Sequence, residues 1–499
     1  MKTVITPIGI FCTFLTLAMA SARAQTYTNL HTFTSPVFDS SNDALTNSDG
    51  MDPNNGGLVA SGNVLYGTTW EGGINGNGTL YSVQTDGSHF TVLHTFSAPY
   101  VTELSATNSD GSKPQQTLAL QSNVLYGTTS EGGRGGYGTV FKVNTDGTGF
   151  TNLYYFKGGS DGINPYGGVV VVGGTVYGST TAGGTGIAGT VYRVNTDGSG
   201  YKIMHNFTGA ANDGGIGVGS LVASNGVLYG VTRGGGGAAG HGVVFALSTN
   251  ANGTAAGYTN LHVFMGNPTP GDVSTNNDGA TPEAALLLSD GTLYGTTTAG
   301  GTNGAGLVFS IRTDGTGYTA LHVFSYADPD GADTNSDGSQ PFCALTLAGN
   351  TLYGTAAAGG TNGNGTVFAV QTDGTGFTNL YTFVPIITFI PTFMNLGGSA
   401  PEAGVVLADG NLYGTTAVGG PATGNVYGII PSSSGSAPVP IPLNVQLSAG
   451  SIVLSWSGSG FSLYSTPSFN APFSLVPGAT NHYTVGATNA QQFFRLQAN

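Results

Sequence analysis

Short apolar segments alternate with glycine-rich polar segments along the chain, and they return in one fixed order. One unit reads LAL at 118–120, VLYGTT at 124–129, GTVFKV at 138–143 and FTNLYYF at 150–156. The second and third segments are apolar on both faces rather than alternating, which is typical of fully buried strands. Thr-Asp-Gly precedes the fourth segment, and Asp-Gly supplies the backbone angles that a tight hairpin needs. The pattern predicts four short antiparallel strands per unit and an all-β fold.

The order of the strands predicts a closed ring. A Tyr-Gly pair in the second strand marks seven units, at Tyr66, Tyr126, Tyr177, Tyr229, Tyr294, Tyr353 and Tyr413. A repeat of this length indicates a propeller or a solenoid. The seventh unit ends at Ile430 without a fourth strand, whereas a lone fourth strand, Tyr27–Phe33, stands at the N-terminal end. Pairing of Tyr27–Phe33 with Asn425–Ile429 would complete a seven-bladed β-propeller and leave no open sheet edge.

The two ends of the chain lie outside the repeats. Residues 1–24 combine Lys2, an apolar run and an Ala-Arg-Ala sequence, which predicts a secretory signal peptide cleaved before Gln25. A membrane anchor is the alternative, but the apolar run is short for a span. The propeller is expected at 25–430, followed by a Ser/Pro-rich linker at 431–441. Residues 442–499 predict a small immunoglobulin-like β-sandwich with Trp456 in its core.

Composition narrows the class of protein. Charged residues make up 7% of the chain and hydrophobic residues 39%, the opposite of a disordered protein. The net charge of −14 argues against nucleic acid or an anionic membrane as the main partner. Cys12 leaves with the signal peptide, so Cys343 has no partner and is expected to be a buried, inert thiol. We expect a monomer with no later membrane-spanning segment, secreted or held at the surface or in the periplasm of a Gram-negative bacterium.

The repeat resembles a known family. The unit LYGTT, a glycine loop, GTVF, TDGTGFTNLHTF and an Asp-Gly-x-x-Pro sequence are similar to the GloVer (Gloeobacter/Verrucomicrobia) tandem repeats over about residues 26–430. The resemblance implies an exported bacterial repeat protein, and it implies no catalytic residue. The tail WSGSGFSLYSTPSF resembles a C-terminal module of exported proteins from such bacteria.

Residues that repeat in most units are interpreted as structural. Five histidines share one register of the fourth strand, where Tyr154 and Tyr381 replace them: His31, His94, His205, His262 and His322. Catalysis would need such a group once, so these side chains are expected to pack. The glycine after each repeated tyrosine is expected to allow close approach of the next sheet.

Functional residues are sought where the units differ. In an up-and-down sheet, the loops between second and third strands share one end with the crossovers to the next unit; we name this end the crossover rim. Most of its loops are small and neutral. Six residues break that pattern and are candidates for ligand binding: Trp70, Glu71, Arg134, Tyr137, Arg233 and His241. Short crossovers into the third and fourth units predict a cleft beside them, and solvated loop decoration is the alternative.

Acidic residues gather on the same rim. Six crossovers carry Asp-Gly, and all five glutamates fall on the crossover rim, which is therefore expected to be acidic. If the predicted cleft holds no ligand, Glu283 and Glu402 at the channel mouth are the next candidates. One crossover also has calcium-like spacing, with Asp333, Asn335 and Asp337. An Asx turn is the alternative there, because the twelfth position is Ala344 rather than glutamate.

Three functions stay open from the sequence. The favoured one is a binding or scaffold module that recognises a glycan or a protein on the crossover rim. The second is an enzyme on that rim, a polysaccharide lyase or glycoside hydrolase; in a lyase His241 or Tyr137 would be the base and an arginine would bind a carboxylate. The third is a purely structural surface component. No nucleotide-binding loop, Ser-His-Asp pattern or zinc spacing occurs.

Overall fold

The computed structural model describes part of the chain in two compact units, Met1–Pro431 and Ser432–Asn499. In the first unit it describes residues 25–40, 44–53, 56–101, 106–237, 240–250, 255–265, 275–326, 334–384, 387–389, 392–420 and 423–431. In the second unit it describes 444–448, 451–455, 461–466, 474–476, 482–486 and 493–498. The predicted signal peptide and Trp456 lie outside the described residues.

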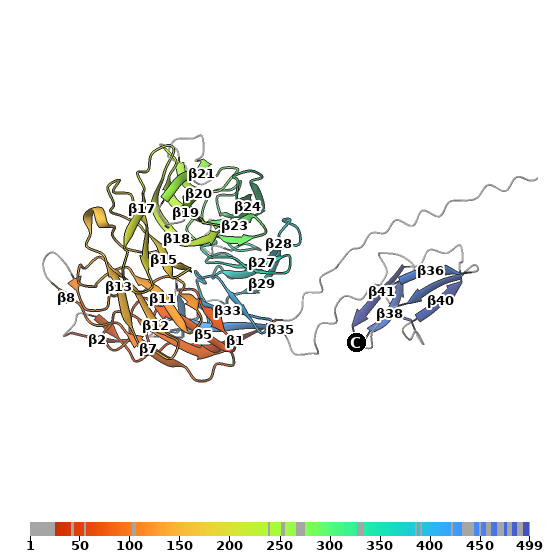
Figure 1. Cartoon of the computed structure of the whole chain (residues 1–499). Coiled ribbons are helices and arrows are strands. Elements are labelled where there is room, and N and C mark those ends of the chain that lie inside the picture. Colours follow the sequence, from red (N-terminus) through yellow and green to blue (C-terminus); the bar gives the residue numbers. More distant parts are fainter. Residues whose placement is uncertain are drawn as a thin grey trace, which may run out of the picture. The chain divides into compact units, whose positions relative to one another are not determined.

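Seven four-stranded antiparallel sheets build the first unit, and each is one blade of a β-propeller (Figure 1). The first strand spans three residues in six blades and eleven residues in blade 4. These inner strands are, for blades 1 to 7, β4 (Val59–Ser61), β10 (Ala119–Gln121), β14 (Val170–Val172), β18 (Gly214–Ser224), β22 (Leu287–Ser289), β26 (Thr346–Ala348) and β32 (Val406–Ala408). The second strands are β5 (Val64–Thr69), β11 (Val124–Thr129), β15 (Thr175–Thr180), β19 (Val227–Gly235), β23 (Thr292–Thr297), β27 (Thr351–Ala356) and β33 (Asn411–Thr416).

The third and fourth strands complete each blade in the predicted order. The third strands are β6 (Thr79–Gln84), β12 (Thr139–Asn144), β16 (Thr190–Asn195), β20 (Gly240–Thr249), β24 (Leu307–Arg312), β28 (Thr366–Gln371) and β35 (Asn425–Pro431). The outer strands are β7 (Thr91–Thr95), β13 (Thr151–Tyr155), β17 (Lys202–Asn206), β21 (Ala255–Met265), β25 (Thr319–Val323), β29 (Thr378–Thr382) and, in blade 7, β1 (Gln25–Thr32). The second strands are buried over almost their whole length, as their apolar pattern predicts.

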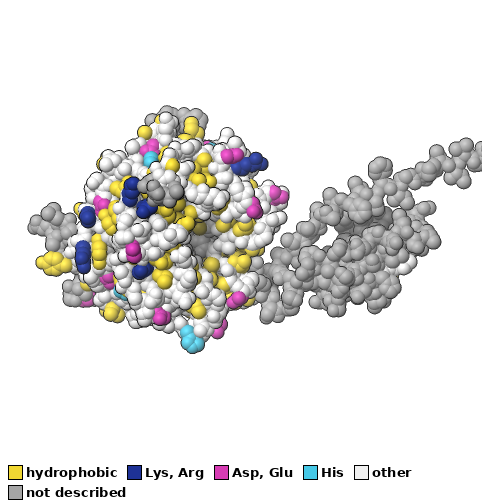
Figure 2. All heavy atoms as spheres, in the orientation of Figure 1, with side chains coloured by type: hydrophobic (Ala, Val, Ile, Leu, Met, Phe, Trp, Pro, Cys, Tyr) yellow, Lys and Arg dark blue, Asp and Glu magenta, His cyan; other side chains and the backbone are white. Residues whose placement is uncertain are grey.

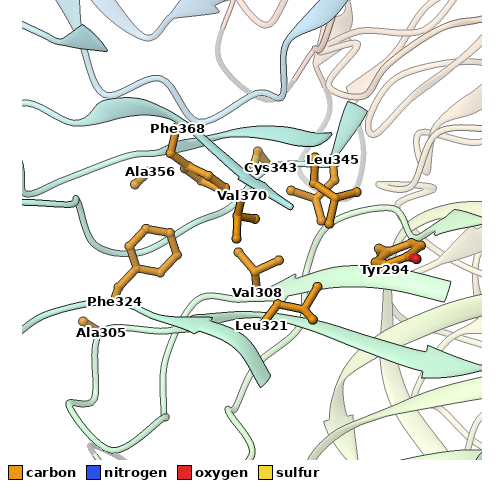
Figure 3. Close-up of a cluster of buried hydrophobic side chains, with 11 residues drawn as sticks. Tyr294, Ala305, Val308, Leu321, Phe324, Cys343, Leu345, Ala356, Phe368 and Val370 are labelled. Carbon is orange, nitrogen blue, oxygen red and sulfur yellow. The ribbon is translucent and has the colours of Figure 1, made fainter. Parts of the chain in front are cut away.

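The N-terminal strand closes the ring, which confirms the prediction. β1 pairs antiparallel with β35, with Tyr27 opposite Ile429 and Thr32 opposite Asn425. A cluster of buried hydrophobic side chains joins each blade to the next, and the cluster between blades 5 and 6 contains Phe324 and Phe368 (Figure 3). An equivalent cluster joins blade 7 to blade 1 through Phe33 and Tyr81. The hydrophobic core is therefore a continuous ring with no end.

The glycine that follows each repeated tyrosine makes room for side chains of its own sheet. The expectation that it allows close approach of the next sheet is wrong. Gly127 pairs with Phe141 across β11 and β12 of one blade. A Cβ at Gly127 would lie 2.6 Å from the ring of Phe141 and 2.8 Å from Leu118 of the same blade. The aromatic ring of the third strand lies over the glycine, so any side chain there would displace it.

Outer strands of neighbouring blades are joined by stacked rings. The repeated histidine or tyrosine of one blade stacks on the aromatic residue that begins the outer strand of the next blade. Ring centroids are 3.5 to 4.1 Å apart in six pairs: His31–Phe90, His94–Phe150, Tyr154–Tyr201, His205–Tyr258, His262–Tyr318 and His322–Phe377. In the seventh pair Tyr381 stacks on Tyr27 of β1 at 5.0 Å. The packing role predicted for the histidines is thereby confirmed.

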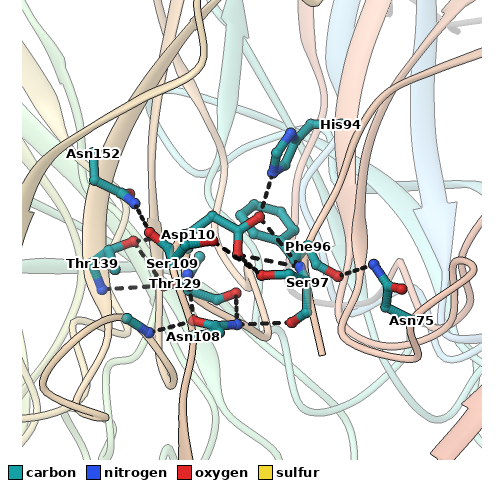
Figure 4. A network of polar contacts seen from close by, with 12 residues as sticks. Asn75, His94, Phe96, Ser97, Asn108, Ser109, Asp110, Thr129, Thr139 and Asn152 are labelled. Atoms are coloured by element: carbon teal, nitrogen blue, oxygen red, sulfur yellow. Dashed lines mark hydrogen bonds and ion pairs between the residues drawn. The ribbon is translucent and has the colours of Figure 1, made fainter. Parts of the chain in front are cut away.

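Each of these six tight stacks is tied to a crossover aspartate. His94 Nε2 lies 2.9 Å from Asp110 Oδ2, and the backbone N–H and hydroxyl of Ser97 donate to the same carboxylate (Figure 4). The equivalent pairs are His31–Asp49, Tyr154–Asp161, His205–Asp213, His262–Asp278 and His322–Asp337. Burial raises the pKa of Asp110, but the hydrogen bonds from His94 and Ser97 outweigh it and hold that pKa below its usual value. We call this arrangement the crossover clamp.

Smaller elements decorate the propeller. Two hairpins lie in crossovers, β2 (Val37–Asp39) with β3 (Ala44–Thr46) and β8 (Tyr100–Val101) with β9 (Ala106–Thr107). The crossover into blade 7 carries β30 (Ile387–Phe389) and β31 (Thr392–Ser399), which form a sheet with β34 (Val418–Gly420). The only helical element of the described residues is a 3₁₀ turn, η1 (Gly159–Asp161). Accordingly, no helix in the described part of the chain is long and apolar enough to span a bilayer.

The second unit consists of two three-stranded sheets. One contains β36 (Asn444–Ser448), β37 (Ser451–Ser455) and β40 (His482–Gly486); the other contains β38 (Phe461–Thr466), β39 (Ser474–Leu475) and β41 (Phe493–Ala498). Both sheets are antiparallel. The immunoglobulin-like topology and the domain boundaries stay predictions.

Ring closure by β1 predicts the effect of a truncation. Removing residues 25–33 from the mature protein takes away the outer strand of blade 7 and its stack on Tyr381. We expect a loss of several kcal/mol, comparable to the stability of a whole domain, and hence a large fall in the melting temperature. Thr26→Ala, at an exposed position of β1, is the control and should melt like the parent. An unchanged melting temperature for the truncated protein would contradict closure.

Candidate functional site

One left-handed residue fixes the path of every crossover. Its φ lies between +51° and +59° in all seven blades, at Asp52, Lys113, Asn164, Ile216, Thr281, Gln340 and Ala400. Non-glycine residues adopt this conformation at a cost of order 1–3 kcal/mol, so surrounding contacts must hold it. The N–H of each residue donates to a carbonyl of the preceding blade, as Lys113 does to Asn77 at 3.0 Å. In blade 2 the Lys113 carbonyl also accepts from Ser130 of its own blade.

The next residue is proline in six blades, and it packs against the preceding blade. Gly138 of blade 2 has a φ of +96°, and a Cβ there would lie 2.6 Å from Cδ of Pro165 in the crossover to blade 3. The residue after the proline is therefore delivered to one place in each blade. In the described residues this residue varies, and it is Gln115, Tyr166, Glu283, Phe342 or Glu402.

A cavity of about 190 Å³ lies where the inner strands begin. Its lining comes from six blades, which places it on the axis of the ring at the crossover rim. Tyr166, Glu283, Phe342 and Glu402 contribute the aromatic and charged side chains, and small residues such as Ala284 fill much of the remaining wall. We call this cavity the channel mouth. A wider cavity of about 720 Å³ on the opposite rim has Asp290 as its one charged lining residue among those described.

The two glutamates of the channel mouth differ in their surroundings. Arg233 Nε lies 3.1 Å from Glu283 Oε1, and the Glu283 side chain is 20% exposed. Burial raises the pKa of Glu283, and the charge of Arg233 opposes this rise. Burial also raises the pKa of Glu402, and there the negative charge of Glu283 adds to the rise. Glu402 thus holds a proton more readily than an ordinary glutamate, without a cation to oppose it.

A third carboxylate, Asp52, does not line the cavity but interacts with Glu402 through its charge. It is the left-handed residue of the crossover into blade 1. Burial, with smaller contributions from the charges of Glu402 and Glu71, raises its pKa to about 7. The pKa values of Asp52, Glu283 and Glu402 are thus all raised, mainly by burial.

The structure separates the residues proposed from the sequence. Arg233 reaches the channel mouth through Glu283, and Glu71 acts on Asp52 through its charge. The other four lie elsewhere on the crossover rim. Trp70 lies under Lys113, whose Nζ is 5.0 Å from its ring; Arg134 lies 5.0 Å from the ring of Tyr155. Tyr137 packs with the hydrophobic cluster of blades 2 and 3. The His241 carbonyl accepts the N–H of Thr281.

The crossover rim is less acidic than its sequence indicates. The crossover aspartates that were expected to charge the rim belong to the clamps, and Asp49, Asp110, Asp213 and Asp337 are all buried. Their charge is satisfied by histidine and backbone donors and does not face a ligand. Outside the clamps, the described carboxylates of this rim include Glu71, Glu131, Glu283 and Glu402.

The calcium hypothesis receives no support from the two described residues. Asn335 Oδ1 accepts the N–H groups of Gly338 and Gly360, at 2.8 and 2.7 Å. Asp337 belongs to the clamp with His322. The same asparagine contacts recur at Asn47, Asn108 and Asn276, in loops that lack the first aspartate. Asp333 lies outside the described residues, so calcium binding stays an untested hypothesis, and the contacts favour a turn.

Sequence reasoning gave too little weight to the channel mouth. Glu283 and Glu402 were second choices, and Asp52, Tyr166 and Phe342 were not singled out. A signal was present, because the residue after the crossover proline varies while its neighbours repeat. Aligning the seven units and comparing the residue after the proline would have identified these side chains as a group.

The fold and the site define a seven-bladed β-propeller with a charged and aromatic cavity on its axis. The chain belongs to the Gloeobacter/Verrucomicrobia repeat family, whose model matches residues 99–274 and 272–439. This confirms the resemblance seen in the repeats. No curated protein matches the sequence.

Solved structures with distant similarity include enzymes. An oligogalacturonate lyase in complex with manganese is 10% identical, with 82% of this chain and 98% of that chain covered and a TM-score of 0.45. A puromycin-hydrolysing peptidase of Mycobacterium tuberculosis is 10% identical, with 80% and 57% covered and a TM-score of 0.44. A putative 6-phosphogluconolactonase of Bacteroides uniformis is 12% identical, with 69% and 89% covered and a TM-score of 0.39. At these values none of the activities is transferred to this chain.

The raised pKa of Asp52 predicts that Asp52→Asn stabilises the folded protein at high pH but not at low pH. The folded state binds this proton more tightly than the unfolded state, so the contribution of Asp52 to stability is complete below about pH 4 and is lost as the pH rises through about 7. Asparagine tolerates the left-handed backbone and stays neutral. The melting temperature of Asp52→Asn should therefore exceed that of the parent by about 2 °C or more at pH 8 and match it below pH 4.

Asp409→Asn is the matched control, because Asp409 has a φ of +47° in an exposed turn. Its effect on the melting temperature should not vary between these pH values. An Asp52→Asn effect that is equal at pH 4 and pH 8 would show that the carboxyl is not buried as described.

Proposed function

We propose that this protein is an exported glycan-binding propeller and that it binds a sugar unit at the channel mouth. The observation that carries the proposal is the axial cavity itself. The ends of six crossovers converge there, and the side chains they contribute differ, combining carboxylates with aromatic rings. A framework that repeats everywhere except at one converging position is the arrangement expected of a binding site.

The chemistry of the channel mouth suits a neutral sugar. Carboxylates accept hydrogen bonds from neighbouring hydroxyl groups, and a charged acceptor strengthens such bonds. Tyr166 and Phe342 supply apolar faces against which a sugar ring can pack. The cavity is smaller than the roughly 300–1,000 Å³ of a site for a drug-sized ligand, so it holds a single small unit.

A longer chain would find further contacts on the crossover rim. Ten of the eleven large, exposed hydrophobic side chains of the described residues lie there, and three of them are aromatic: Phe38, Tyr100 and Tyr326. Figure 2 shows hydrophobic side chains spread over the visible face with only scattered charges between them. Exposed aromatic rings can pack against sugar rings of a longer chain. Trp70, Arg134, Tyr137 and His241 are further rim residues available to such a chain.

A glycan explains these features better than a protein partner does. The apolar side chains are spread around the crossover rim rather than gathered into one broad patch, and the polar groups converge in a narrow cavity. Protein interfaces usually centre on a contiguous apolar area of several hundred Å². The proposed export places the site outside the cytoplasm, where polysaccharides are accessible.

Glycan binding predicts a specific pattern among glutamate variants. On a glycan array, the mature protein should bind at least one neutral oligosaccharide. Replacing both carboxylates in Glu283→Gln/Glu402→Gln should weaken this binding at least about tenfold, since each lost charge-assisted hydrogen bond is worth about 1.5–3 kcal/mol. The melting temperature should not fall.

Glu131→Gln is the control on the same rim. Glu131 is 48% exposed and pairs with Lys113, away from the channel mouth. It should bind like the parent. Failure of the mature protein to bind any glycan would refute the proposed function and favour a structural role. If the double variant binds glycan as well as the parent does, the binding site lies on the crossover rim outside the channel mouth.

A further inference from the structure

We propose that the channel mouth also cleaves its ligand, with Glu402 as general acid and Glu283 as base in the hydrolysis of a glycosidic bond. This inference rests on the proposed glycan binding and goes beyond it to an activity. It stands on a cavity in which two glutamates from different blades, an arginine beside one of them and two aromatic rings meet.

The two glutamates are positioned as a pair that can act across a ligand. Glu283 comes from the crossover into blade 5 and Glu402 from the crossover into blade 7, and both line the same cavity. Their charges interact, because Glu283 raises the pKa of Glu402. No hydrogen bond joins these two described side chains, so they do not share one proton as an aspartic-protease pair does. Glycoside hydrolysis uses two carboxyl groups in separate roles, one on each side of the bond that breaks.

The surroundings assign different roles to the two glutamates. Burial raises the pKa of both glutamates, but at Glu283 the ion pair with Arg233 opposes this rise and stabilises the charged form that a base needs. Glu402 is buried without a cation beside it among the described residues, which favours its protonated form and suits an acid. A pair of carboxyl groups whose environments separate their protonation states is the usual arrangement for acid–base work near neutral pH.

The proposed reaction needs no oxidant or cofactor. Glu402 donates its proton to the glycosidic oxygen as the bond from that oxygen to the anomeric carbon breaks. A water molecule forms the new bond to the anomeric carbon, and Glu283 accepts the proton that this water releases. The products are two sugars with free hydroxyl groups, and the proton passes from Glu283 back to Glu402 through solvent.

The same geometry argues for a neutral substrate and against elimination from a uronate. Lyase chemistry would need a cation to neutralise the sugar carboxylate. Arg233 is already paired with Glu283, so it does not offer a free cation to a uronate, and the negative charge of Glu283 opposes a second carboxylate in the cavity. The substrate class is therefore an uncharged polysaccharide.

Release of reducing ends tests the activity. The mature protein is incubated with barley β-glucan, xylan, galactomannan and starch, and with polygalacturonate as an anionic comparison. At least one neutral polysaccharide should release reducing ends, and polygalacturonate should release none and form no unsaturated product. Glu402→Gln and Glu283→Gln should each lose about 10²–10⁴-fold in kcat/KM. Glu131→Gln should match the parent.

A substrate with an activated leaving group separates the two roles. The 2,4-dinitrophenyl glycoside of the cleaved sugar needs no protonation to depart. Glu402→Gln should therefore hydrolyse it within about tenfold of the parent, whereas Glu283→Gln should still show the large loss, although both variants keep their melting temperatures. Equal losses for both variants would overturn the assignment of acid and base.

The outcomes also separate this inference from the proposed function. Binding of neutral glycans without release of reducing ends would refute hydrolysis and leave glycan binding intact. Absence of both would refute both. Release of reducing ends that Glu283→Gln and Glu402→Gln do not reduce would show that the cleavage does not occur at the channel mouth.

Discussion

The crossover clamp is the interaction on which the rest of this propeller depends. A buried aspartate such as Asp110 accepts hydrogen bonds from the outer strand of one blade while its own segment leads into the next blade. The ring bound to that aspartate stacks on the following outer strand. One carboxylate thus couples two blades and the connection between them. Removing a partner from such a buried charge costs more than the contact itself is worth, so each clamp strongly couples an outer strand to the described end of its crossover.

The clamps also help to position the candidate site. The clamp leads to the left-handed residue and the proline, and the residue after that proline lines the axial cavity in four blades. The residues that shape the crossovers can repeat because the varied side chains occupy one position, the residue after the proline. Glu283, Glu402, Tyr166 and Phe342 differ from one another while the residues that position them do not. Side chains of different chemistry are therefore brought together where the blades converge.

Much of the fold could be predicted because the residues that form each blade recur in the same order in every unit of the sequence. The lone outer strand at Tyr27 predicted closure of the ring. The histidines that share one register of the outer strands predicted a packing role. The partner of those histidines was missed, since the aspartates lie at variable distances along the chain and were counted as surface charge. The same error made the crossover rim look acidic. For the candidate site, the sequence pointed to residues that are unusual within one repeat, such as Arg134 and Tyr137. The burial of Glu402 and its interaction with Glu283 arise only because different blades meet at the axis. The sequence of a single repeat does not contain that information.

A crystal structure of the mature protein with a bound neutral oligosaccharide would test the central claim most directly. The account predicts one sugar ring in the axial cavity, between Tyr166 and Phe342, with its hydroxyl groups within hydrogen-bond distance of Glu283 and Glu402. The rest of the chain should extend over the crossover rim, and the clamps should not move. A sugar bound only beside Trp70 or Tyr137, with the axial cavity filled by ordered water, would contradict the account.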